Sequence, residues 1–80
     1  MEIRYSKKAA KYINKQDKNN RAIIKNAIEN LPSGDVKVYY NHDIATHRLR
    51  IGNYRVLYYY YDLEDNIYIE KIGSRGDVYK

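Results

Sequence analysis

The chain has 80 residues, carries 15 Lys and Arg against 10 Asp and Glu, and contains 11 Tyr but no Phe, Trp or Cys. This length predicts a single small domain over residues 1–80. The absence of Cys excludes a disulfide framework and thiolate metal sites. No apolar stretch approaches the length of a membrane span and no signal-peptide core begins the chain, so we expect a cytoplasmic protein with no membrane contact. The remaining classes are a small enzyme, a nucleic-acid binder and an interaction module.

The formal net charge of +5 is unevenly distributed. Residues 1–40 hold nine Lys and Arg and four acids, whereas residues 41–80 hold six of each. The first half is rich in lysine, which is a strongly hydrated point charge, and the second half holds four of the six arginines, whose guanidinium groups fork onto phosphate. The lysines therefore indicate a solvated helix face or long-range attraction to a polyanion.

The first half predicts one strand and two helices. Residues 2–5 alternate as in a strand, and Ser6 is suited to cap a helix over residues 7–16. Asp17 can cap a second helix, whose apolar residues Ile24, Ala27 and Ile28 follow helical spacing and which ends at residues 32–34.

The second half predicts β-structure. Residues 36–40 fit a short strand or an extended loop, and residues 41–45 fit a loop. Strands are expected at residues 46–51, 54–61 and 67–72, with Gly52 and Asn53 forming a two-residue hairpin turn. The order β-α-α-β-β-β gives an α+β fold, in which two N-terminal helices pack on one face of a largely antiparallel sheet.

The hairpin turn predicts which residues face each other. It places Arg50 opposite Arg55, and it directs Arg48, Arg50 and Arg55 to the sheet face away from the helices. Like charges in opposed positions cost stability, and no acid stands in the paired positions of this hairpin. The arginines could splay into solvent or meet Glu70 on the next strand. Alternatively, they form an anion site suited to bidentate contact with phosphate.

The four consecutive tyrosines should alternate between the two faces of their strand. Tyr58 and Tyr60 are expected to pack toward the helices. Tyr59 and Tyr61 are expected on the arginine face, where they could stack on RNA bases, contact a protein partner or form plain surface.

The sequence indicates neither a metal site nor a small-molecule cofactor. His42 and His47 have no ligand partners at a useful spacing and are expected to be structural. Metal-free phosphodiester cleavage remains open, because arginines can stabilise a crowded phosphate. If the tail folds back onto the sheet, Tyr79 is a candidate base, since nearby arginines favour a phenolate.

Two motifs in the second half of the chain resemble those of a known protein family. Residues 47–58 resemble the hairpin pattern RLRxGxYRVxY of the RelE/ParE superfamily of bacterial and archaeal type II toxins, and residues 72–80 resemble its ending xGxRxxVY. The resemblance covers almost the whole chain. It implies a RelE-like toxin, an mRNA interferase that cuts mRNA in the ribosomal A site without metal, leaving a 2′,3′-cyclic phosphate and a 5′-OH.

The resemblance also implies residue roles and partners. Arg48 and Arg55 match the residues that clamp the transition state, Arg75 matches the acid or leaving-group stabiliser, and Tyr79 matches the base. Arg50 matches a basic position on the same face. The implied partners are the ribosome, mRNA and a cognate antitoxin, which we expect to dock on the second helix or on a sheet edge.

Two other functions remain open. A ParE-like member would share the fold, lack nuclease activity and inhibit DNA gyrase. A non-catalytic basic module would bind RNA or a protein with a steep dependence on salt.

Overall fold

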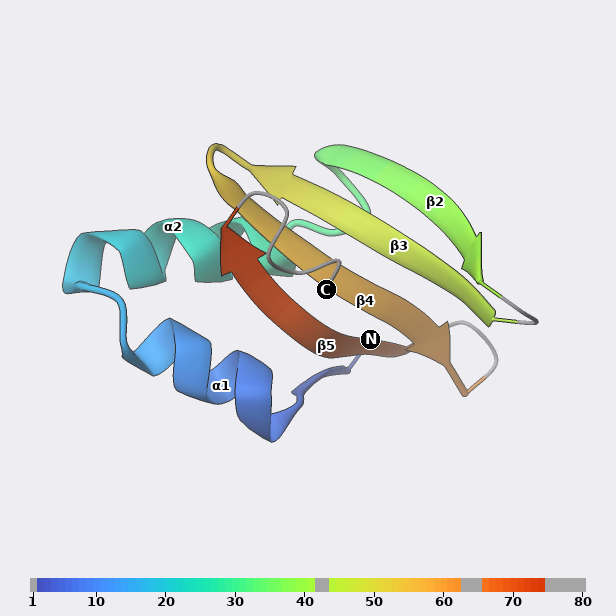
Figure 1. The fold of residues 1–80 in the computed structure, drawn as a ribbon, viewed down its shortest axis with the longest axis horizontal. Coiled ribbons are helices and arrows are strands. Elements are labelled where there is room, and N and C mark those ends of the chain that lie inside the picture. Colours follow the sequence, from blue (N-terminus) through green and yellow to red (C-terminus); the bar gives the residue numbers. More distant parts are fainter. Residues whose placement is uncertain (1, 42–43, 63–65, 75–80) are drawn as a thin grey trace.

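The computed structural model describes residues 2–41, 44–62 and 66–74. Its elements run in the order β1 (Ile3–Tyr5), α1 (Lys7–Asn14), α2 (Lys18–Glu29), β2 (Asp35–Asn41), β3 (Ile44–Ile51), β4 (Tyr54–Tyr61) and β5 (Asn66–Ser74). Both helices lie against the same face of the sheet (Figure 1). The α+β class and the two-layer arrangement predicted from the sequence are therefore confirmed.

The sheet has five strands in the order β1-β5-β4-β3-β2, so β2 and β1 form its two edges. Only β1 and β5 run parallel, and the other neighbours are antiparallel. The element order written from the sequence is one strand short, because the segment left as strand or loop forms β2 and pairs along β3. The expected loop over residues 41–45 is also too long, since β2 reaches Asn41 and β3 begins at Ile44.

The two helices begin at side-chain caps, as predicted. The hydroxyl of Ser6 accepts a hydrogen bond from the backbone N–H of Ala9 at 3.0 Å, and Asp17 accepts one from Asn20 at 2.8 Å. Each bond satisfies an N–H that has no partner within its helix. No helix in the described ranges is long and apolar enough to cross a membrane.

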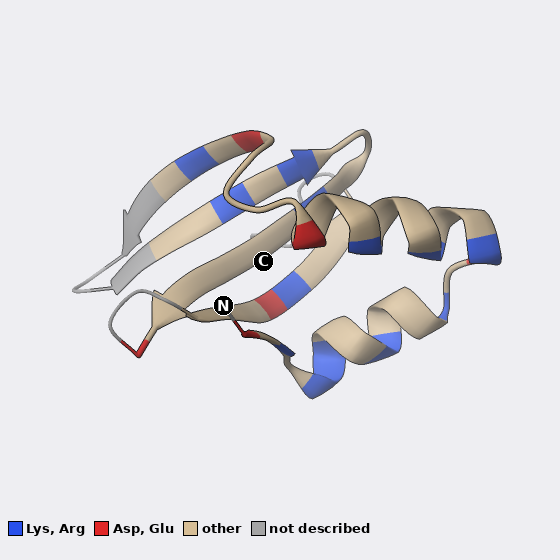
Figure 2. Cartoon of the chain, turned by 180° about the vertical axis from the view of Figure 1, so that it is seen from behind, with Lys and Arg blue, Asp and Glu red and all other residues tan. Residues whose placement is uncertain are grey.

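The core fills the space between the helices and the sheet. Each helix contributes residues one turn apart, and the three central strands contribute alternate residues. The buried apolar residues are Ala9, Ile13, Ile24, Ile28, Leu31, Leu49, Val56, Tyr58, Ile67, Ile69 and Ile72. Figure 2 shows the Lys and Arg positions spaced along both helices. A mostly aliphatic core explains how a chain without Phe or Trp packs, with Tyr58 as its buried ring.

The β3–β4 register follows the prediction. The Cα partners are Ile51 with Tyr54, Arg50 with Arg55, Leu49 with Val56, Arg48 with Leu57, and His47 with Tyr58. Gly52 has φ of +56°, the left-handed conformation that primed hairpin turns require at their first central residue. The turn therefore fixes which strand residues face outward.

A β-bulge interrupts β5. Leu57 pairs with Lys71 but Tyr58 pairs with Ile69, so Glu70 is an extra residue on β5. The hydroxyl of Ser6 donates to the Glu70 carbonyl at 2.7 Å, which links the bulge to the start of α1. Because of this extra residue, Ile69 and Ile72 both face the core despite their odd spacing in the sequence.

Candidate functional site

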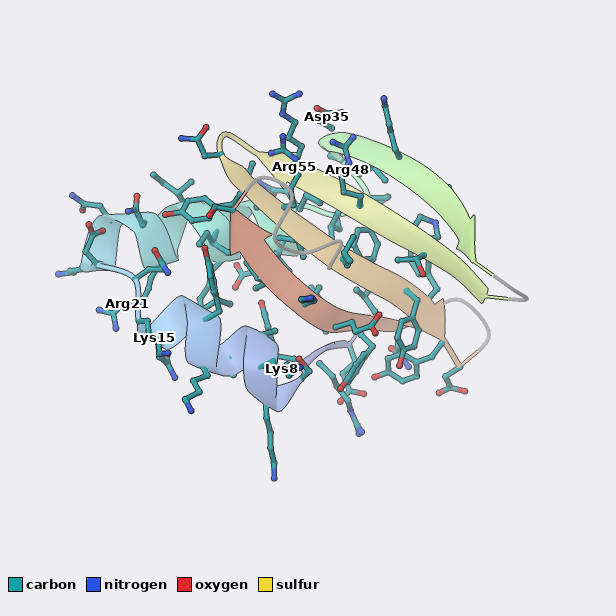
Figure 3. All side chains as sticks on the ribbon, in the orientation of Figure 1. Lys8, Lys15, Arg21, Asp35, Arg48 and Arg55 are labelled. Atoms are coloured by element: carbon teal, nitrogen blue, oxygen red, sulfur yellow. The ribbon has the colours of Figure 1, made fainter. Side chains whose placement is uncertain are left out.

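The sheet face opposite the helices carries a cluster of three arginines, which we call the arginine cluster: Arg48 and Arg50 on β3 and Arg55 on β4. Arg50 and Arg55 are Cα partners, and Arg48 is two residues from Arg50 on the same face. Figure 3 shows Arg48 and Arg55 near the hairpin end of the sheet, with Asp35 beside them. The structure therefore brings these three predicted residues together.

Arg48 is the most enclosed member of the arginine cluster. It is only 6% exposed, whereas Arg50 is exposed and Arg55 is half-buried. Its Nη2 lies 3.6 Å from Oδ1 of Asp35 on β2, and the carboxylate compensates part of the cost of burying the charge.

This ion pair corrects one expectation from the sequence. If they formed no anion site, the arginines were expected to splay into solvent or to meet Glu70, but the acid that approaches Arg48 is Asp35. Asp35 pairs across the sheet with Arg50 and also contacts Arg48. Sequence reasoning missed this residue because the strand β2 had been left undecided. The polar start of a segment that pairs with β3 was the signal that could have found it.

The guanidinium of Arg55 is held by its own hairpin. Its Nη1 donates to the Gly52 carbonyl at 3.2 Å and to the Tyr54 carbonyl at 3.1 Å. These contacts occupy one nitrogen and orient the group at the end of the sheet. A pre-oriented arginine loses less conformational freedom when it binds an oxyanion.

Tyr59 and Tyr61 belong to the same face of β4 as Arg55. Because β-strand residues rise about 3.3 Å each, Tyr59 stands about 13 Å along the strand from Arg55. The Tyr59 ring lies 5.2 Å from the ring of Tyr68 on β5, centroid to centroid. Burial, and then the neighbouring Tyr68, raise the pKa of Tyr59. Tyr59 is therefore an aromatic surface at neutral pH and a poor candidate for a base.

Two of the predicted catalytic residues, Arg75 and Tyr79, lie outside the described residues, as does His42. His47 stacks on Tyr58 at 5.2 Å and meets the edge of Tyr60 at 4.9 Å, which places it in an aromatic packing cluster. Over the described ranges, no group of three or more His, Asp or Glu is arranged to hold a metal ion.

Seven of the nine basic residues of the first half lie on or beside the helices, and the other two, Arg4 and Lys37, lie on β1 and β2. All are exposed, and Figure 3 shows Lys8, Lys15 and Arg21 pointing away from the sheet. The seven on or beside the helices are Lys7, Lys8, Lys11, Lys15, Lys18, Arg21 and Lys25. The helix layer thus carries the excess positive charge, and the arginine cluster lies on the opposite face.

An open pocket of about 560 Å³ lies where the helices meet the hairpin tip. Its wall includes Tyr12, Ile23 and Tyr54. Ile23 directly precedes the buried Ile24 on α2, yet it is 52% exposed. Ile23 lines this pocket together with Tyr12 and Tyr54, so several apolar groups meet there.

No protein-family model and no curated protein sequence matches the chain. Solved structures do match over nearly its full length. A chain of the archaeal RelE–RelB complex from Pyrococcus horikoshii superposes with a TM-score of 0.73 at 24% identity, covering 95% of this chain and 96% of that one. The chain has a RelE-like fold.

Two further structures with the RelE-like fold agree. The toxin–antitoxin complex RelBE2 from Mycobacterium tuberculosis matches with a TM-score of 0.68 at 22% identity, covering 92% of this chain and 96% of that one. The isolated E. coli RelE toxin matches with a TM-score of 0.64 at 21% identity, covering 98% and 89%. The RelE-like fold predicted from the two sequence motifs is therefore confirmed.

Proposed function

We propose that this protein is the toxin of a type II toxin–antitoxin system and acts as a ribosome-dependent endoribonuclease on mRNA in the A site. The observation that carries the proposal is the arginine cluster on the open face of a RelE-like fold. Three guanidinium groups within two paired strands provide the cationic surface that a phosphodiester in its crowded transition state requires. The RelE structures of similar fold point the same way.

The chemistry we propose needs no metal. The ribose 2′-OH attacks its own 3′-phosphate, the P–O5′ bond breaks, and the products are a 2′,3′-cyclic phosphate and a 5′-OH. Arg48 and Arg55 neutralise the charge that develops on the phosphate oxygens. Tyr79, as the phenolate, removes the 2′-OH proton, and Arg75 stabilises the leaving O5′, which becomes the 5′-OH by taking a proton from Arg75 or from water.

The RNA strand lies across the outer face of the sheet. Arg50 contacts the backbone, and Tyr59 and Tyr61 provide surfaces on which bases stack. The close Tyr59–Tyr68 pair supports this assignment, because it gives the face a continuous aromatic area beyond the arginines. The basic helices on the opposite face add long-range attraction to a ribosome in the cytoplasm.

A cognate antitoxin completes the system. Solved complexes with the RelE-like fold are toxin–antitoxin pairs, which supports a partner of this kind. The exposed Ile23 beside the 560 Å³ pocket favours docking on the α2 surface. Apolar antitoxin side chains that fill this pocket would remove Ile23 from water.

The test is to induce the protein without an antitoxin and to map mRNA 5′ ends by primer extension. We expect growth arrest with cleavage in translated codons. Arg55→Ala and Arg75→Ala should each lower cleavage by about a hundredfold or more. Arg4→Ala is the matched control, because Arg4 forms an exposed ion pair with Glu2.

Growth arrest with intact mRNA contradicts the proposal. If the arrest comes with DNA damage and altered supercoiling, unaffected by Tyr79→Phe, the protein is a gyrase inhibitor of the ParE kind. If there is no arrest but purified protein binds RNA in a salt-dependent way, it is a non-catalytic module.

A further inference from the structure

The buried guanidinium of Arg48 has a loosely held binding edge. Nε and Nη2 share one edge of the planar guanidinium group. A carboxylate or phosphate docks to this edge through two parallel hydrogen bonds. Nη2 lies 3.6 Å from Oδ1 of Asp35, which is longer than a hydrogen bond. Nε is buried and has no hydrogen-bond acceptor among the described residues. Within the part of the chain that the structure describes, this edge is therefore incompletely satisfied, although the Arg48 side chain is only 7% exposed.

Asp35 is free to leave that edge. It is the first residue of β2, at the edge of the sheet, and its side chain is 58% exposed. Among the described residues, its only ion pair is the one with Arg48. Its carboxylate loses little hydration in the present position, so turning it into solvent costs little.

We infer that Asp35 is a displaceable counter-ion, which compensates Arg48 in the free protein and gives way to a phosphate group of the ligand. The ligand class, an RNA phosphodiester, rests on the proposed function, whereas the exchange of anions rests on the geometry of Arg48 and Asp35. One phosphate oxygen accepts from Nε and a second from Nη2, and the Asp35 carboxylate turns away from the incoming negative charge. No covalent bond changes in this exchange.

The presence of Asp35 has two opposite effects. It stabilises the free protein, because a buried guanidinium without any counter-ion is costly. It weakens ligand binding, because the phosphate must displace the Asp35 carboxylate and is then repelled by this nearby negative charge. Removing this carboxylate should therefore lower stability in the absence of anions and strengthen the binding of phosphate.

The test compares Asp35→Asn with Glu29→Gln, which also removes one negative charge but lies on α2 and is exposed. Melting temperatures are measured in buffers of equal ionic strength with chloride or with inorganic phosphate. We expect Asp35→Asn to melt lower than wild type in chloride and to gain several degrees more from phosphate. Its Kd for phosphate should fall about fivefold, whereas Glu29→Gln should follow wild type.

A second pair of measurements separates the sources of phosphate. A short 2′-O-methyl RNA, which has no 2′-OH to attack, should bind Asp35→Asn about fivefold more tightly than wild type. Asp35→Glu, which restores the charge, should return both affinities toward wild type. If only inorganic phosphate responds, Asp35 controls a free-anion site rather than an RNA site, and the inference fails for RNA.

The inference is overturned if phosphate raises the melting temperatures of wild type and Asp35→Asn equally, or if Asp35→Asn binds phosphate more weakly. If Asp35→Asn is unfolded in chloride and phosphate alone restores the fold, the inference is supported. If both anions restore it equally, or neither does, it is wrong. Because no measurement here uses cleavage, a failed nuclease proposal and a failed counter-ion proposal give different results.

Discussion

Arg50 and Arg55 face each other directly across the β3–β4 hairpin, with their Cα atoms paired. Opposed like charges on neighbouring strands are destabilising, and Asp35 stands opposite Arg50 on its other side. A domain selected for stability alone would not need this arrangement. Replacing one arginine of this pair therefore tests whether the pair costs stability, as expected of residues retained for binding.

Replacement of Arg50 by Gln should stabilise the protein. We expect the free energy of unfolding to rise by about 0.5 kcal/mol in low salt, because the repulsion with Arg55 is removed. The gain should shrink in about 1 M NaCl, which screens the charges. Urea unfolding of Arg50→Gln and of the exposed-lysine control Lys8→Gln measures this effect. A loss of stability in low salt would mean that the Asp35–Arg50 pairing outweighs the repulsion.

Ser6→Ala should be more harmful than Asp17→Ala, although both remove a helix cap. We expect a cost of about 2 kcal/mol for Ser6→Ala and about 1 kcal/mol for Asp17→Ala. The reason is that the Ser6 hydroxyl also donates to the Glu70 carbonyl, so the substitution removes this donor from the carbonyl at the bulge. Denaturant unfolding of the two variants provides the comparison, and equal costs would show that the contact with the bulge contributes nothing.

Gly34 should tolerate substitution less well than Gly52. A Cβ at Gly34 would stand 2.9 Å from Cδ1 of the buried Leu49, at a φ of +120°. A Cβ at Gly52 meets nothing within 4 Å. We expect Gly34→Ala to cost about 3 kcal/mol and Gly52→Ala about 1 kcal/mol, the latter from its left-handed backbone alone. Thermal unfolding measures both, and a mild Gly34→Ala would show that Leu49 can move aside.

Stability should fall in alkaline solution because of buried tyrosines. Burial is the main cause that raises the pKa of Tyr58, and Tyr60 adds to it. The unfolded phenol ionises near pH 10 while the folded one stays neutral, so this contribution is complete below about pH 10 and is lost as pH rises toward the folded pKa. Tyr5, whose pKa is also raised by burial, adds a second contribution.

The measurement is the urea midpoint between about pH 8 and pH 11. Tyr58→Phe should flatten the alkaline decline most, and Tyr5→Phe should flatten it less. An unchanged slope in Tyr58→Phe would mean that Tyr58 does not couple ionisation to unfolding.

The hairpin was predictable because a two-residue turn determines which residues of the two strands lie opposite each other. From Gly52 alone the sequence placed Arg48, Arg50 and Arg55 on one face, and the observed register agrees. The helix caps were predictable for a similar reason, since Ser6 and Asp17 act on N–H groups three residues away. Short-range geometry was therefore the part of this fold that local chemistry could determine.

The strand β2 and its Asp35 were not predictable in the same way. Residues 35–41 pair with β3 through a connection whose geometry the sequence does not specify, so the acid beside Arg48 could not be placed. The bulge at Glu70 escaped for a different reason. The apolar residues Ile67, Ile69 and Ile72 change their spacing within one strand, and that change was itself the signal of an extra residue.

The bulge at Glu70 determines which side chains of β5 face the core on each side of it. If Glu70 took an ordinary place in the ladder, strict alternation along β5 would turn Ile72 outward and Lys71 into the core. The extra residue changes which side chains of β5 face the core. Before it, β5 pairs with β1; after it, β5 pairs with the part of β4 that carries Arg55. Deletion of Glu70 would therefore leave a regular ladder in which Ile69 and Ile72 still face the core, and it would remove the carbonyl that accepts a hydrogen bond from Ser6.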